Sequence, residues 1–390
     1  MLVLAAIVAG VAAYFVASTP KTSAGVRFPL SASQQALLAQ VPASADAFAY
    51  VPSAAVLDAK LRANPVTRAQ VEQWTAKQNL PLPWMLGGAD LVAWRSNKQT
   101  RFAVRLDPLR ALFARAYVSF SGESKLLINT GPDESPLGAD ELQRILALAN
   151  ALPPSDALVV QRAGGRGAFP PMARPSVTAV AIGKDDVVVT SRAARDPDDV
   201  AIAVKTTFAR SALLTFASSK APRAIGDLNR LFGAKVSELI ADGGEIVLYD
   251  IKTGTLLPRP KGVIVVPSTP EREATVDHLV GSAGGLLTTA VANGELLVGV
   301  DDESAGLYIK DAKEPLAWPA NRWAARIDAA RIIPILQKLA GNPGFRLAAP
   351  KLYRSAKDLD RWIGALEGAS RIEAADSVDG EVEELKVRVR

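Results

Sequence analysis

The chain has no cysteine among its 390 residues. This absence excludes disulfides, thiolate nucleophiles, cysteine-based zinc sites and the lipid-bearing cysteine of a bacterial lipoprotein. Histidine is nearly absent too, because His278 is the one copy. A Ser-His-Asp or histidine-rich zinc mechanism would depend on that residue, and the neighbouring Asp277 would not share its helical face. We expect His278 to be a surface or capping residue, and the sequence predicts no catalytic, cofactor-binding or metal-binding residue.

The chain also lacks a large excess of either charge, with 45 Lys and Arg against 40 Asp and Glu. Nucleic-acid binding would need basic residues gathered in one stripe with aromatic platforms, and the sequence has no such cluster. We therefore expect no nucleic-acid partner. The apolar fraction of 49% and the charged fraction of 22% are typical of a globular protein that can bury a core.

The first twenty residues carry no charged side chain, and the run from Leu2 to Ala17 is continuously apolar. As a helix, this run would span about 25–30 Å, close to the thickness of a bilayer core. We predict an uncleaved transmembrane anchor over residues 1–20 that contacts the lipid bilayer. A buried core helix and a cleavable signal peptide, cut near Thr22-Ser23-Ala24, are the alternatives.

The charges that flank the predicted anchor bear on its orientation. Lys21 and Arg27 follow the apolar run, and no basic residue precedes it. Because positive charge usually stays in the cytoplasm, this pattern alone would place the rest of the chain inside the cell. A basic leader ahead of Met1 would remove that conflict. We expect the bulk of the chain to be extracytoplasmic, and periplasmic in a Gram-negative cell.

The rest of the chain predicts an α+β fold, in which the transmembrane helix is followed by two similar units of largely antiparallel sheet with packed helices. Residues 21–40 form a tether and a first helix, which Ser33 would cap. The two units would cover residues 41–204 and 205–390. Each would end in a hairpin, Ser176–Ile182 with Asp186–Arg192 and Ser370–Ala375 with Val382–Val389.

Two related segments suggest an internal repeat. Residues 101–107, Arg-Phe-Ala-Val-Arg-Leu-Asp, resemble residues 322–328, Arg-Trp-Ala-Ala-Arg-Ile-Asp. In both, a strand would run into a helix capped by the aspartate, Asp107 or Asp328, and an arginine follows three residues later. The sequence thus predicts that these segments are equivalent parts of the two units.

The sequence Lys252-Thr253-Gly254-Thr255 resembles the third motif of penicillin-binding proteins and serine β-lactamases. That family also needs a Ser-x-x-Lys nucleophile on a core helix, whereas the copy upstream, residues 18–21, lies at the end of the predicted anchor. A turn between strands Glu245–Ile251 and Gly262–Val266 explains the motif more simply. We therefore interpret it as a connection.

Glycine-rich and acidic segments also lack a specific pattern. The glycines of residues 164–167 and 281–285 do not match a phosphate-binding or dinucleotide-binding loop. The pairs Asp185-Asp186, Asp198-Asp199 and Asp301-Asp302 are expected in turns, where Asp forms local hydrogen bonds, and the ligand spacing of a calcium loop is missing. Both features indicate connecting segments, and no cofactor is expected.

The layout of the chain joins a short apolar start to Val41-Pro42-x-x-x-Asp46-Ala47 before a strand, then Trp84-x-Leu86-Gly87 and a partial repeat. This layout resembles a loose group of N-terminally anchored bacterial envelope proteins of unknown function, a resemblance that implies location without chemistry. Our leading hypothesis is a non-enzymatic, membrane-anchored extracytoplasmic protein that binds a protein partner of the envelope or an apolar ligand. The alternatives are a serine hydrolase of cell-wall or ester substrates that uses Lys252 or another lysine, and a lipid carrier.

Overall fold

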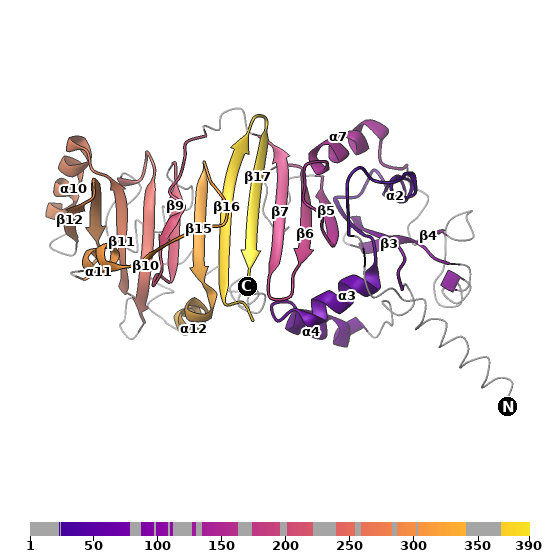
Figure 1. Cartoon of the computed structure of the whole chain (residues 1–390), viewed down its shortest axis with the longest axis horizontal. Coiled ribbons are helices and arrows are strands. Elements are labelled where there is room, and N and C mark those ends of the chain that lie inside the picture. Colours follow the sequence, from indigo (N-terminus) through magenta and orange to yellow (C-terminus); the bar gives the residue numbers. More distant parts are fainter. Residues whose placement is uncertain are drawn as a thin grey trace. The chain divides into compact units, whose positions relative to one another are not determined.

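A computed structural model gives the fold of the chain. It describes residues 23, 25–78, 87–96, 99–107, 110–111, 127–129, 135–162, 174–195, 201–220, 239–253, 259–282, 287–301, 303–340 and 368–390. Within these ranges the predicted α+β class is confirmed, with mainly antiparallel strands and few helices (Figure 1). The predicted anchor, the glycines of 164–167 and the pair Asp198-Asp199 lie outside them. Among the described ranges, no helix has the length and apolar character needed to cross a membrane.

Two compact units divide the chain. The first takes the described residues up to Arg195 together with Glu381–Glu384, and the second takes Asp196–Gly380 with Leu385–Arg390. The sequence places this boundary after residue 204, and the structure places it after Arg195.

The first unit is one antiparallel sheet with helices on both faces. Its strands follow the order β7-β6-β5-β1-β2-β3-β4. Phe48 and Trp94 on one face pack with residues of α2 and α7, and Val104 on the other face packs with Ala54 of α3. The elements are α2 (Ala32–Leu38), β1 (Ala47–Val51), α3 (Ala54–Ala63), α4 (Arg68–Gln78), β2 (Leu91–Ser96), β3 (Gln99–Arg105), β4 (Leu127–Asn129), α7 (Ala139–Ala149), β5 (Ala157–Gln161), β6 (Ser176–Ile182) and β7 (Val187–Ala194).

The second unit has a sheet of the order β12-β13-β11-β10-β9-β15-β16-β17, where β17 belongs to this unit from Leu385 onward, and β8 pairs with β14 apart from it. Ile246 and Val276 belong to the core between this sheet and α10, whereas Val247 and Tyr308 belong to the core under α11. The elements are β8 (Thr207–Ala209), β9 (Leu214–Ser218), β10 (Gly244–Lys252), β11 (Arg259–Pro267), α10 (Pro270–Ser282), β12 (Thr288–Ala292), β13 (Glu295–Gly299), α11 (Ser304–Lys310), β14 (Lys313–Pro315), β15 (Trp323–Asp328), α12 (Ala329–Ala340), β16 (Arg371–Asp379) and β17 (Val382–Val389).

The two strand orders follow the chain in the same way. In each unit a first strand (β1 or β9) lies in the middle, the next two (β2 and β3, or β10 and β11) lie on one side, and the last three (β5 to β7, or β15 to β17) lie on the other. By this correspondence β3 matches β11, and β15 matches β5. The similar segments 101–107 and 322–328 overlap β3 and β15, so they occupy different places in their sheets.

Asp107 and Asp328 both accept the backbone hydrogen bond that the sequence predicts for a helix cap. The backbone N–H of Arg110 donates to Asp107 Oδ1 at 3.0 Å, and that of Arg331 donates to Asp328 Oδ1 at 3.1 Å. The predicted hairpins are present as β6 with β7 and β10 with β11, and β16 neighbours β17.

The predicted cap of the first helix was wrong by two residues. Ser31 caps α2, since its hydroxyl accepts from the N–H of Gln34 and the Gln34 side chain accepts from the N–H of Ser31. This reciprocal capping box satisfies two backbone donors together, which Ser33 could not do from inside the first turn.

Candidate functional site

A cavity lined by several charged side chains lies at one end of the sheet of the second unit, and we call it the Glu245 pocket. It has a volume of about 320 Å³ and forms where β9 and β11 end and where β10 and β13 begin. Residues 202–205, which precede β8, complete its wall. Its ionisable lining consists of Lys205, Asp242, Glu245 and Glu295. Three carboxylates against one ammonium give the wall a negative balance, which favours a cation or a hydrogen-bond donor.

Glu245 reaches this pocket because of the alternation of β10. Successive side chains of a strand point to opposite faces, so Glu245 shares a face with Val247 and Tyr249. Only 2% of Glu245 is exposed. The Tyr308 hydroxyl donates to its Oε2 at 2.8 Å, but its Oε1 has no hydrogen-bond partner. Burial raises the pKa of Glu245 above its ordinary value, although the facing ammonium of Lys205 opposes this.

Lys205 joins the groups of the pocket. Its Nζ lies 2.7 Å from Glu295 Oε1, 2.6 Å from the Tyr308 hydroxyl and 3.2 Å from Glu245 Oε2. Burial alone would lower the pKa of this ammonium, but the carboxylates of Glu245 and Glu295 outweigh it and raise the pKa. Lys205 is therefore charged, and Glu295 compensates its charge even where Glu245 holds a proton.

The Tyr308 ring is fixed by a second lysine. Lys313 Nζ lies 3.2 Å from the ring centroid and donates to the Tyr308 carbonyl at 3.0 Å. A cation over the face of a tyrosine is attracted by the negative face of the ring. This contact holds the ring so that the hydroxyl reaches both Lys205 and Glu245.

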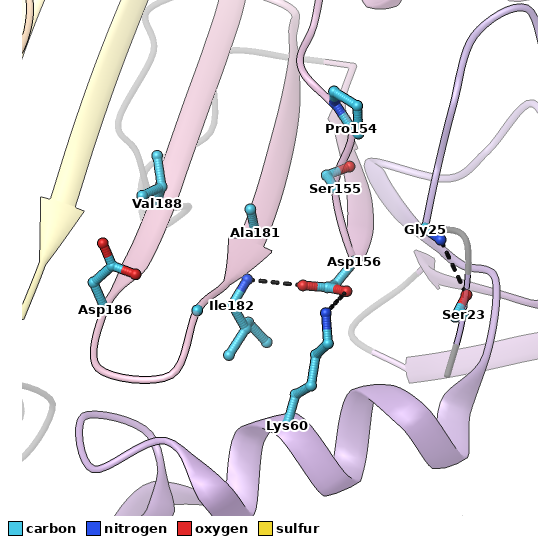
Figure 2. A pocket seen from close by; sticks show the side chains of 11 residues that line it. Ser23, Gly25, Lys60, Pro154, Ser155, Asp156, Ala181, Ile182, Asp186 and Val188 are labelled. Atoms are coloured by element: carbon cyan, nitrogen blue, oxygen red, sulfur yellow. Dashed lines mark hydrogen bonds and ion pairs between the residues drawn. The ribbon is translucent and has the colours of Figure 1, made fainter. Parts of the chain in front are cut away.

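A second pocket, of about 310 Å³, lies in the first unit (Figure 2). Lys60 extends from α3 to Asp156, with Nζ 2.7 Å from Oδ1, and the other oxygen of Asp156 accepts from the N–H of Ile182 at 2.8 Å. Ser155 also lines this pocket, and its buried hydroxyl has no hydrogen-bond partner. A lysine that activates serine must be neutral and within hydrogen-bond reach of the hydroxyl. Lys60 is instead paired with a carboxylate, so this arrangement ties α3 to the sheet.

The residues of the sequence motifs lie away from both pockets. His278 is exposed on α10, and Lys252 is exposed at the end of β10, opposite Arg259. Asp301 forms the expected local hydrogen bonds, since its Oδ1 accepts from the N–H groups of Glu303 and Ser304, both at 2.8 Å. Gly254 and Thr255 lie outside the described residues.

Sequence reasoning missed the residues of the Glu245 pocket. One signal was present, because the alternation of β10 puts a carboxylate on the same face as Val247 and Tyr249. A charge on an apolar face requires a partner. The partners Lys205 and Tyr308 come from distant parts of the chain, and no spacing in the sequence connects them with Glu245.

Comparison of the chain with protein-family models, curated proteins and solved structures finds no match. Within the described part of the chain, no three His, Cys, Asp or Glu side chains come together as a metal site would require.

Proposed function

We propose that this chain is a non-enzymatic binding protein whose second unit binds a small polar ligand in the Glu245 pocket. In this proposal residues 1–20 anchor the protein in a membrane, and both units are extracytoplasmic. The observation that carries the binding function is Oε1 of Glu245, a buried acceptor without a donor on the wall of a cavity. Such an atom costs about 1–3 kcal/mol, which a donor on a ligand would offset.

The charges of the pocket favour a polar ligand over the apolar ligand that the sequence suggested. An apolar ligand would remove water from Lys205, Glu245 and Glu295 without replacing its hydrogen bonds, and that desolvation opposes binding. A ligand of a few heavy atoms with one or more donors fits both the size and the negative balance of the wall.

Calorimetric titration of the full chain in detergent tests the binding function. The compounds would be small amines, polyols, amides and carboxylates at fixed pH and ionic strength. We expect at least one class to bind saturably and Glu245→Gln to weaken that binding about tenfold or more, since it removes an acceptor of nearly the same shape. Tyr249→Phe is the control, because its hydroxyl is buried without a partner. The binding proposal fails if no class binds, or if both variants bind as the wild type does.

The location is tested separately with a protease. A carboxyl-terminal tag would be exposed to protease in cells whose outer barrier is opened and whose inner membrane is intact. Digestion of the tag supports extracytoplasmic units. Protection would mean that Lys21 and Arg27 are read as cytoplasmic charges, and the proposed location would be wrong.

A further inference from the structure

The oxygen atoms around Lys205 form a site for an ammonium group. Glu245 Oε2, Glu295 Oε1 and the Tyr308 hydroxyl all lie within 3.2 Å of Nζ. A primary ammonium has three N–H donors, and here each has an oxygen acceptor. The Tyr308 hydroxyl fits this role because it donates its own proton to Glu245 and so accepts from the lysine. We call these three oxygens the ammonium cradle.

The ammonium group that fills the cradle belongs to Lys205, whose side chain can move out of the cradle. Lys205 lies in the irregular segment 201–206, and its side chain is 34% exposed. The backbone of this segment is held separately, by N–H donors of Ile202 and Val204 to the carbonyls of Asn321 and Ala320 at 2.9 and 3.1 Å. The flexible four-carbon stem of lysine can therefore turn toward water while the backbone stays in place.

We propose that the ligand of the Glu245 pocket is a primary amine, and that its ammonium replaces that of Lys205, with Glu245 accepting through its unpartnered Oε1 and with Glu295 and Tyr308 as the other two acceptors. This inference rests on the proposed binding function and adds the ligand class. A secondary ammonium has two donors and a quaternary one has none, so neither satisfies three acceptors. A neutral hydroxyl does not compensate the carboxylates, and an anion is repelled by them. With Lys205 turned away, Asp242, Glu245 and Glu295 are the ionisable side chains that remain on the wall of the pocket.

The test uses three probes of equal chain length, n-butylamine, butan-1-ol and butyltrimethylammonium, titrated into the full chain in detergent. We expect n-butylamine to bind the wild type saturably and about tenfold or more tightly than either of the others, and Glu245→Gln to remove this preference. Lys205→Met should bind n-butylamine about tenfold more tightly than the wild type does, because the internal competitor is gone.

The first unit supplies a matched control. Lys60 also pairs with a carboxylate at 2.7 Å beside a cavity of similar volume, but it faces one carboxylate instead of two. Lys60→Met should leave the affinity for n-butylamine unchanged. An equal gain in affinity for n-butylamine in both lysine variants would show that an amine replaces the lysine of any ion pair, and would overturn the inference.

The remaining outcomes separate the two proposals. If a neutral compound binds in a manner sensitive to Glu245→Gln and n-butylamine does not, the ligand class is wrong and the binding function stands. If n-butylamine binds Lys205→Met but not the wild type, Lys205 is a structural ion pair and the inference is overturned. If no probe or panel compound binds any form, both proposals fail. Should Lys205→Met not fold, the wild-type preference among the three probes and its loss in Glu245→Gln decide the matter.

Discussion

Tyr308→Phe measures how strongly the ammonium cradle stabilises the second unit. The change removes one hydroxyl and keeps the ring, together with its contact to Lys313. Glu245 Oε2 loses a donor at 2.8 Å while it stays buried, and a hydrogen bond to a charged group contributes about 1.5–3 kcal/mol. Lys205 loses an acceptor at 2.6 Å but is partly exposed, so water replaces most of that loss. We expect a destabilisation of about 2–4 kcal/mol, the sum of a large and a small loss.

Tyr249→Phe is the matched control for this measurement. Tyr249 and Tyr308 are 6% and 3% exposed and belong to the same core cluster, but the Tyr249 hydroxyl has no hydrogen-bond partner. Its removal should change the free energy of unfolding by less than about 0.5 kcal/mol, or should stabilise the unit, because a buried unpaired hydroxyl is costly. Urea unfolding of the full chain in detergent gives both values. Equal effects of the two changes, or a Tyr308→Phe effect below about 0.5 kcal/mol, would refute the role given to the cradle.

Three further predictions test other parts of the structure. Gly262→Ala should destabilise by about 1–3 kcal/mol in urea unfolding, because its Cβ would lie 2.5 Å from the Val247 carbonyl oxygen, whereas Gly281→Ala, with no atom within 4 Å in α10, should stabilise by about 0.5–1 kcal/mol. Asn64→Ala should destabilise by about 2–4 kcal/mol in the same assay, because three hydrogen bonds of its side chain are lost. Its amide group donates to the carbonyls of Gly183 and Asp186 at the β6–β7 turn, and its oxygen accepts from the N–H of Val66. The stability of the second unit should fall as pH rises from 4.5 through the raised pKa of Glu245, because the folded state keeps this proton longer than the unfolded state does. Glu245→Gln should flatten that part of the profile, and an unchanged slope would contradict the assignment.

Much of the fold was accessible from local sequence signals. The alternation of β17 and the turn residues Gly183 to Asp186 of the β6–β7 hairpin act between neighbours in the chain, so short windows reveal them. The cap at Asp107 was found for the same reason. Ser31 was missed because Ser33 also precedes a helical pattern, and the choice depends on which serine faces Gln34 across the first turn.

The candidate site was not accessible in this way. Glu245, Lys205 and Tyr308 are separated by 40 or more positions in the sequence and meet only because β10, the segment before β8, and α11 pack together. The strand pattern marks Glu245 as a charge on an apolar face, but it does not identify the cation or the hydroxyl that faces it. These three residues meet at the ammonium cradle only because distant parts of the chain pack together.

The apparent repeat shows the same difference between local and long-range information. Residues 101–107 and 322–328 are similar because in each an aspartate after a strand accepts from the backbone N–H of an arginine three residues later, a local solution that many strand ends can use. The shared strand order instead matches β3 with β11 and β5 with β15. Positions on those strands need only alternate between buried and exposed, so many apolar residues serve equally well and little identity is required. The similarity of the two strand orders is therefore a feature of strand pairing, while the similarity in sequence belongs to a local hydrogen bond that recurs at two different places.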